Sequence, residues 1–356
     1  MKLGLGLYRH MLTADNFRFA RQAGATHLVV HLVDYFRGGA HRTRDDQPVG
    51  TDLGWGLAGD PDRLWTEEEL VSLRKSVEAE GLVLEAIENI DPAHWHDVLL
   101  DGPQRAKHIG NVKTLIRRMG AAGIPILGYN FSIAGVAGRT TGNYARGGAP
   151  SVGMEGPYDK PMPQGMAWNM IVSEQIGPDN LPTITHQELW RRLEAFLAEV
   201  LPVAEEAGVK LAAHPDDPPT PFVRGQPRLV YQPAMYQKLI DLNRSPANTL
   251  EFCIGSLAEM TEGDVYDAVD TYSEQGRLGY VHFRNVTGKA PYYKETFIDD
   301  GDIDMLRVLS ILKRNRYDGV LIPDHTPQMS CAAPWHAGMA YAMGFMRAAM
   351  RSLSIG

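Results

Sequence analysis

The chain has 356 residues, of which 44% are hydrophobic and 22% charged, and its formal net charge is −8. These values are typical of a soluble globular protein with a full hydrophobic core. Because the chain is acidic and has no lysine- or arginine-rich run, we exclude nucleic acid as a partner, although a local arginine cluster can still bind a small anion.

Eight short apolar runs are predicted to form β-strands. In chain order they are Lys2–Leu7, Thr26–Val30, Leu82–Ile87, Ile124–Leu127, Lys210–Ala213, Thr249–Phe252, Leu278–Val281 and Gly319–Ile322. Each run is followed by a helical pattern. The predicted helices cover about 13–24, 66–80, 104–119, 185–207, 233–242, 265–275, 304–315 and 339–353. Thr66 with Glu69, and Thr185 with Glu188, fit capping boxes at two of the helix starts.

Strict alternation of eight strands and helices favours a parallel sheet closed into a TIM (β/α)8 barrel, an α/β fold. We therefore expect a single domain, 1–356, with loop insertions at about 36–62, 132–182 and 215–232. These loops follow strands two, four and five, so they belong to the C-terminal face, where such barrels carry their sites. For the first two loops, two interpretations stand: lids, or contacts between subunits of a homo-oligomer.

The two cysteines, Cys253 and Cys331, form no disulfide framework and suit a reducing cytosol. The N-terminal stretch is too short for a signal peptide, and no stretch approaches a membrane span. We therefore expect a cytoplasmic protein with no membrane partner.

A histidine, a cysteine, a second histidine and an aspartate end the last four predicted strands. They are His214, Cys253, His282 and Asp324. In a closed barrel these strand ends are neighbours, and the mixed donor set suits Mn2+, Fe2+, Co2+ or Zn2+ better than Ca2+. Taken singly, each residue is better explained as a buried structural group. Because four such residues end four successive strands, we prefer metal binding to a structural role and predict a metal site.

Further polar groups are predicted at the same rim, where an arginine can clamp a substrate carboxylate. The candidate substrate-binding residues are Arg9, Asn130, Arg139, Arg284, Asn285 and Glu295. Glu88 and Asn89 follow strand three. His325, beside Asp324, is the candidate general base, because histidine titrates near neutral pH.

Several motifs, in order along nearly the whole chain, resemble the mannonate dehydratase family. They are HPDDPP at 214–219, FCIGS at 252–256, HFRNV at 282–286 and PDH at 323–325. The resemblance implies a TIM barrel related to xylose-isomerase-like enzymes. It also implies dehydration of D-mannonate to 2-keto-3-deoxy-D-gluconate in hexuronate breakdown, with Mn2+ or Fe2+ as cofactor. By motif, the metal ligands would be His214, Cys253, His282 and Asp324.

The segment after PDH departs from the family pattern. The family has a Pro-Gly-Tyr-Gly segment there, whose tyrosine transfers a proton. Aligning its proline on Pro334 puts His336 in the place of the tyrosine. His325 and His336 are thus the predicted proton-transfer pair for removal of an α-proton and protonation of the leaving hydroxyl.

Two other functions stay open. A sugar isomerase or epimerase uses the same barrel, although those enzymes normally hold their metal with Glu and Asp rather than cysteine. A sugar-acid-binding homologue that has lost dehydratase activity would keep the pocket and tolerate the altered 326–336 segment.

Overall fold

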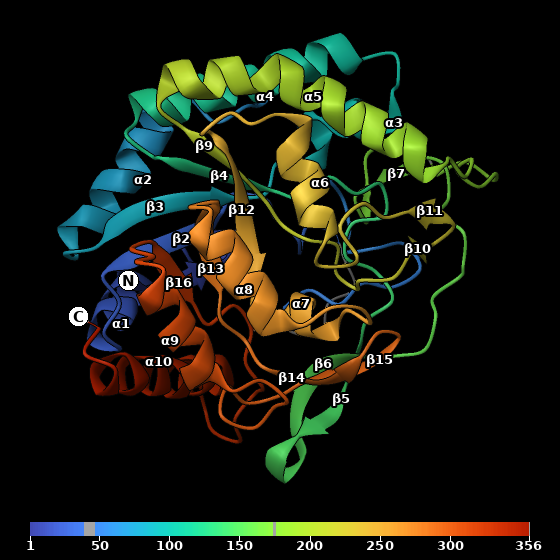
Figure 1. Ribbon diagram of the computed structural model, residues 1–356. Coiled ribbons are helices and arrows are strands. Elements are labelled where there is room, and N and C mark those ends of the chain that lie inside the picture. Colours follow the sequence, from blue (N-terminus) through green and yellow to red (C-terminus); the bar gives the residue numbers. More distant parts are fainter. Residues whose placement is uncertain (39–46, 174–175, 356) are drawn as a thin grey trace.

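The computed structural model describes residues 1–38, 47–173 and 176–355 and has a closed barrel of eight parallel strands at its centre (Figure 1). The hydrogen-bonded order around the barrel is β1-β16-β13-β12-β9-β4-β3-β2. Strands that follow one another among these eight are neighbours in the barrel, as in a TIM barrel. The predicted fold class is therefore confirmed.

The barrel strands lie where the apolar runs predicted them, within about two residues at each end. Their bounds are β1 Lys2–Leu7, β2 His27–His31, β3 Val83–Glu88, β4 Ile126–Tyr129, β9 Lys210–Ala213, β12 Asn248–Cys253, β13 Leu278–His282 and β16 Val320–Ile322. Side chains from six of the eight barrel strands form one separate apolar cluster. It comprises Val29, Ala86, Ile126, Ala212, Tyr280, Val320 and Ile322.

The main helices surround the barrel and bury their apolar faces on it (Figure 1). They are α1 Ala14–Gln22, α2 Glu67–Ala79, α4 Arg105–Ala121, α5 His186–Ala207, α6 Met235–Leu242, α8 Val265–Glu274, α9 Met305–Arg314 and α10 Pro334–Ser352. The capping box at Thr66 and Glu69 is present, and the Thr185 hydroxyl accepts a hydrogen bond from the Glu188 amide. Helix α10 begins five residues before the predicted start, with Pro334 in its first turn, a position that proline favours.

Short elements that the apolar pattern did not predict occupy the connections. The helical ones are η1 Arg9–Met11, η2 Pro92–His94, α3 His96–Leu100, η3 Arg146–Gly148 and α7 Ile254–Glu259. The strands are β5 Thr140–Ala145, β6 Ala149–Glu155, β7 Met166–Ala167, β8 Met170–Ile171, β10 Phe222–Val223, β11 Gln226–Pro227, β14 Val286–Lys289 and β15 Tyr292–Glu295.

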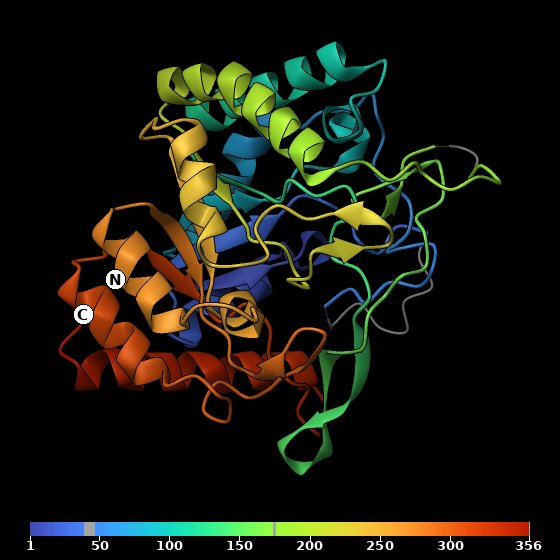
Figure 2. The same ribbon diagram turned by 45° about the vertical axis from the view of Figure 1, so that its right-hand side comes forward.

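The long 132–182 insertion is more ordered than its sequence suggested. Its hairpin β5–β6 joins β15 and β14 in a four-stranded sheet, and the hairpin projects away from the barrel in both views (Figures 1 and 2). This sheet brings β15, with Glu295 at its end, across from the loop that carries Arg139. The part of the 36–62 insertion between 39 and 46 lies outside the described residues. Among the described residues, no helix combines the length and apolarity needed to cross a bilayer.

Candidate metal centre and active-site cavity

The four candidate metal ligands converge at the C-terminal ends of neighbouring strands. Cys253 of β12 and His282 of β13 are register partners, so their side chains leave the sheet on the same side. One ligand atom each from His214, Cys253 and His282 lie within 4.8 Å of one another. Asp324 completes the group, with Oδ2 3.9 Å from Cys253 Sγ and Oδ1 3.4 Å from His282 Nδ1.

Hydrogen bonds select which nitrogen of each imidazole is available to a cation. His214 Nδ1 lies 2.6 Å from the Pro215 carbonyl oxygen, so this nitrogen carries the proton and Nε2 keeps its lone pair. His282 Nε2 lies 3.2 Å from Glu88 and 3.3 Å from Glu251, while its Nδ1 lies 3.4 Å from Asp324, on the side of the other candidate ligands. Carboxylates or carbonyls that hold the far nitrogen are the usual support of metal-binding histidines. The residues present therefore fit a divalent metal.

Charges in the cluster favour its deprotonated anions. Burial alone raises the pKa of the Cys253 thiol, but Arg284 and the two imidazoles outweigh it and lower that pKa to about 5. Burial also opposes ionisation of Asp324, yet His282 and His325 hold its pKa well below the usual value. The thiolate and the carboxylate are the forms that bind metals.

Asp324 adopts a left-handed backbone conformation, with φ of +61°. For a residue other than glycine this conformation is strained, and such strain concentrates at functional sites. Arg284 holds the aspartate in place, because its Nε donates to Asp324 Oδ2 at 2.9 Å.

A cavity with about 530 Å³ of empty space opens beside the cluster. Six predicted site residues line it: Asn130, Arg139, His214, His282, Asp324 and His325. His325 Nδ1 lies 3.2 Å from Glu295 and Nε2 lies 3.4 Å from Asp324, so the ring faces the metal side of the cavity. Arg139 Nη1 lies 3.4 Å from Glu295 and 3.8 Å from Asp217.

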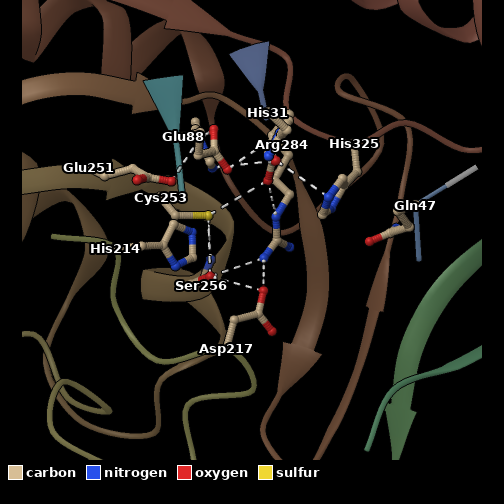
Figure 3. A network of polar contacts seen from close by, with 12 residues as sticks. His31, Gln47, Glu88, His214, Asp217, Glu251, Cys253, Ser256, Arg284 and His325 are labelled. Atoms are coloured by element: carbon tan, nitrogen blue, oxygen red, sulfur yellow. Dashed lines mark hydrogen bonds and ion pairs between the residues drawn. The ribbon is translucent and has the colours of Figure 1, made fainter. Parts of the chain in front are cut away.

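Two predicted substrate contacts are buried in the supporting structure instead. Arg284, only 2% exposed, pairs with Asp217 (Figure 3). It also pairs with Glu259 and Asp324 and is not among the residues that line the cavity. Asn285 donates to the Ile298 and Ile303 carbonyls and so holds the loop after β15. Their contacts position the cavity wall and leave no side-chain atom for a substrate.

The structure does not bring Arg9 or His336 to the cavity. Arg9 donates to the Leu32 carbonyl and lies over the Trp65 ring. His336 lies in the first turn of α10, where Nε2 is 2.9 Å from Asn16 Oδ1 of α1. The early helix start explains its place: a segment expected to be a loop at the rim is a helix packed on α1.

Several cavity residues were not predicted as site residues. They are Tyr8, His31, Tyr35, Trp55, Trp168 and Glu251. His31 follows the predicted end of strand two by one residue, so its position at a strand end was the available signal. Trp55 lies in the connection between β2 and α2 and Trp168 in the turn between β7 and β8, and their ring centroids are 5.2 Å apart in an edge-to-face arrangement. With Tyr35, they give the cavity an aromatic wall.

A second histidine cluster, His96, Asp97 and His108, does not favour a metal. His108 Nδ1 accepts a hydrogen bond from the Asp97 amide at 3.1 Å, so its proton resides on Nε2. With one nitrogen bonded and the other protonated, this imidazole has no lone pair left for a cation.

Comparison with known proteins identifies a family for the chain. The family model D-mannonate dehydratase (UxuA) matches residues 21–349. The chain belongs to this family. A mannonate dehydratase from Streptococcus suis (strain 05ZYH33) is 34% identical over 290 residues, which are 73% of this chain and 74% of the relative. Mannonate dehydratase 2 of Halalkalibacterium halodurans is 28% identical over 275 residues, 74% of this chain and 79% of the relative.

Among solved structures, too, a mannonate dehydratase resembles this chain more than an epimerase does. A mannonate dehydratase from Streptococcus suis serotype2 superposes with a TM-score of 0.73 at 27% identity, covering 99% of this chain and 95% of that chain. An L-ribulose 3-epimerase superposes with a TM-score of 0.57 at 14% identity, covering 99% of this chain and 95% of that one. The latter shows the barrel fold alone. The dehydratase family, and not the wider barrel group, is therefore the relevant comparison for the chemistry.

Proposed function

We propose that the protein dehydrates D-mannonate to 2-keto-3-deoxy-D-gluconate, a step of hexuronate breakdown, with Mn2+ or Fe2+ as cofactor. The observation that carries the proposal is the cysteine-containing donor set at the ends of β9, β12, β13 and the loop after β16, in a member of the dehydratase family. His214 Nε2, the Cys253 thiolate, His282 Nδ1 and Asp324 would hold the metal. When bound, the cation would polarise the substrate carboxylate and adjacent hydroxyl oxygens.

His325 is the proposed base that removes the proton α to the carboxylate. Its ring lines the cavity beside Asp324, and Glu295 holds Nδ1 from behind. A base fixed by a second residue at hydrogen-bond distance is the usual arrangement for proton abstraction. Glu295 acts here by orienting the imidazole, and it is itself held by Arg139.

Asn130 and Arg139 are the proposed substrate-binding groups. Both line the cavity, and Arg139 is 5% exposed at its side chain, so a carboxylate that meets it is largely shielded from water. The aromatic wall also shields the cavity from water and suits the C–H faces of a sugar chain. Self-association of the protein stays a prediction, which light scattering would test.

The deciding experiment is turnover of D-mannonate by the Mn2+-loaded protein, followed by the 2-keto-3-deoxy product. Production of the keto acid supports the proposal. Binding of aldonates without product would favour the sugar-acid-binding alternative. Interconversion of keto sugars without loss of water would favour the epimerase alternative, and either result would overturn the proposed dehydration.

A further inference from the structure

Dehydration needs a second proton-transfer group. The α-proton goes to one residue, and the hydroxyl on the next carbon leaves as water only if another group protonates it. His336 lies against α1 and so does not face the cavity. The cavity wall offers a different pair, His31 at the end of β2 and Tyr35 four residues later.

We propose that Tyr35, held by His31, is the acid that protonates the leaving hydroxyl. This inference rests on the proposed dehydration and adds a catalytic residue to it. Neither residue belongs to the metal cluster or to the motifs that resemble the family.

The hydroxyl of Tyr35 is fixed by two side chains. Tyr35 Oη lies 3.0 Å from His31 Nδ1, and Asn89 Nδ2 donates to the same oxygen at 3.0 Å. The other nitrogen of His31, Nε2, lies 3.7 Å from Glu88 Oε1. His31 and Glu88 are register partners on β2 and β3, so the sheet itself aligns them. A carboxylate, an imidazole and a hydroxyl thus lie in line toward the cavity.

These neighbours suit an acid that must keep its proton until the reaction. Burial and the nearby Glu88 raise the pKa of Tyr35 well above 10, so the phenol is protonated at neutral pH. When the proton leaves, the Asn89 amide is placed to donate to the phenolate oxygen. Stabilising the anion that forms only during the reaction is what a preorganised site does.

The proton balance is closed. The α C–H bond breaks, its proton goes to His325 and its electron pair forms the C=C bond of the enol. The C–O bond to the leaving hydroxyl breaks, the oxygen keeps that electron pair, and the Tyr35 proton converts it to water. The enol becomes the keto acid, His325 releases its proton to solvent, and the phenolate takes one back.

The test uses a substrate whose leaving group needs no acid. D-mannonate and its 3-deoxy-3-fluoro analogue are given to the Mn2+-loaded wild type and to Tyr35→Phe, with keto acid and fluoride as readouts. Fluoride leaves as the anion, so only loss of water depends on the acid. We expect Tyr35→Phe to dehydrate D-mannonate roughly 100-fold more slowly or worse, and to release fluoride within about threefold of the wild-type rate.

The matched control is Tyr129→Phe. Tyr129 is a buried tyrosine at the end of β4 that is not among the residues lining the cavity, and its hydroxyl has no hydrogen-bond partner within the part of the chain that the structure describes. This variant should perform both reactions at the wild-type rate. Retained fluoride release in Tyr35→Phe also shows that the variant is folded and binds metal and substrate.

Two results overturn the inference while leaving the proposed function intact. One is near-normal dehydration by Tyr35→Phe. The other is that Tyr35→Phe loses dehydration and fluoride release to the same extent, while the wild type makes the keto acid from D-mannonate. Failure of the wild type to make keto acid from D-mannonate overturns the proposed function, and the inference falls with it.

Discussion

At the scale of single residues, the two histidines predicted to transfer protons lie in different surroundings. His325 faces the cavity between two carboxylates, whereas His336 bonds to Asn16 and packs edge to face on Phe19 and Trp335. A side chain can transfer a proton only if it reaches the reacting atom directly or through one water. The structure therefore separates the two roles that the sequence alone assigned together.

This separation predicts unequal losses of activity. His325→Asn should lower kcat by at least about 100-fold, because it removes the base, and should leave the bound metal unchanged. His336→Asn should keep kcat within about threefold, since a contact between α1 and α10 affects mainly stability. Keto acid formation and metal content per chain would be measured for both. Comparable kcat losses in the two variants would contradict the placement.

Arg139 gives a second prediction at this scale. Its guanidinium faces the cavity while Asp217 and Glu295 fix it from behind, so it can bind a substrate carboxylate through two parallel N–H groups. Arg139→Lys keeps the positive charge but removes the two parallel N–H donors of the guanidinium. We expect KM for D-mannonate to rise about tenfold with a smaller change in kcat. A kcat loss without a KM change would instead place Arg139 in the support of His325.

At the scale of elements, the barrel strands were predictable because each contains a short and mostly buried apolar run. Strand β13, for example, is buried at every position. Strands β5 and β6 were not predictable, since they are rich in exposed or small residues. They pair with each other, and β6 also pairs with β15, more than 130 residues away. A pairing so distant in sequence leaves no local periodicity.

The residues around the cavity also divide into those that the sequence predicted and those that it did not. Residues that end an apolar run, such as Cys253 and His282, were predicted from the sequence as metal ligands, and the structure brings them close together. His31 was not predicted, although it follows its apolar run as Cys253 follows its own, and Tyr35 was not predicted because it lies in a loop without a period. His336 was misjudged because the start of α10 depends on packing against α1, which no motif in the segment encodes.

The connection between α3 and α4 predicts a pH dependence of stability. His108 Nδ1 accepts the Asp97 amide proton, and burial, followed by the charge of His96, lowers the pKa of His108 to about 4. An unfolded chain takes up this proton near pH 6.5, while the native chain resists it down to about pH 4. Stability from this group is therefore complete above about pH 6.5 and falls as the pH is lowered toward 4.

The measurement is the melting temperature, Tm, between pH 7 and pH 4. Replacing His108 by Gln keeps an acceptor for the amide and removes the titrating group, so the fall in Tm should be shallower than in the wild type. His186→Gln, a change at a partly exposed histidine at the start of α5, serves as the matched control. If Tm of the His108 variant falls with pH as steeply as that of the wild type, His108 is not the source of the pH dependence.

At the scale of the whole molecule, the candidate metal cluster joins β9, β12, β13 and the loop after β16, half of the barrel rim. Without a cation, protons must balance its anions: burial alone lowers the pKa of His214, but Cys253 and Glu251 outweigh it and raise that pKa to about 9. A divalent ion competes with such protons and binds only the folded arrangement. Metal binding should therefore stabilise the barrel as a unit.

At a metal concentration 100 times the Kd, this linkage amounts to about 2.7 kcal/mol of unfolding free energy. Stripping the protein with a chelator should lower Tm by several degrees, and Mn2+ or Fe2+ should restore it, whereas Ca2+, which lacks affinity for thiolate and imidazole, should not. Cys253→Ala should abolish the metal-dependent rise. Cys331→Ala, a change at the exposed free cysteine, should keep it. An equal rise in both variants would mean that the stabilising ion binds elsewhere, and Cys253 would lose its place among the ligands.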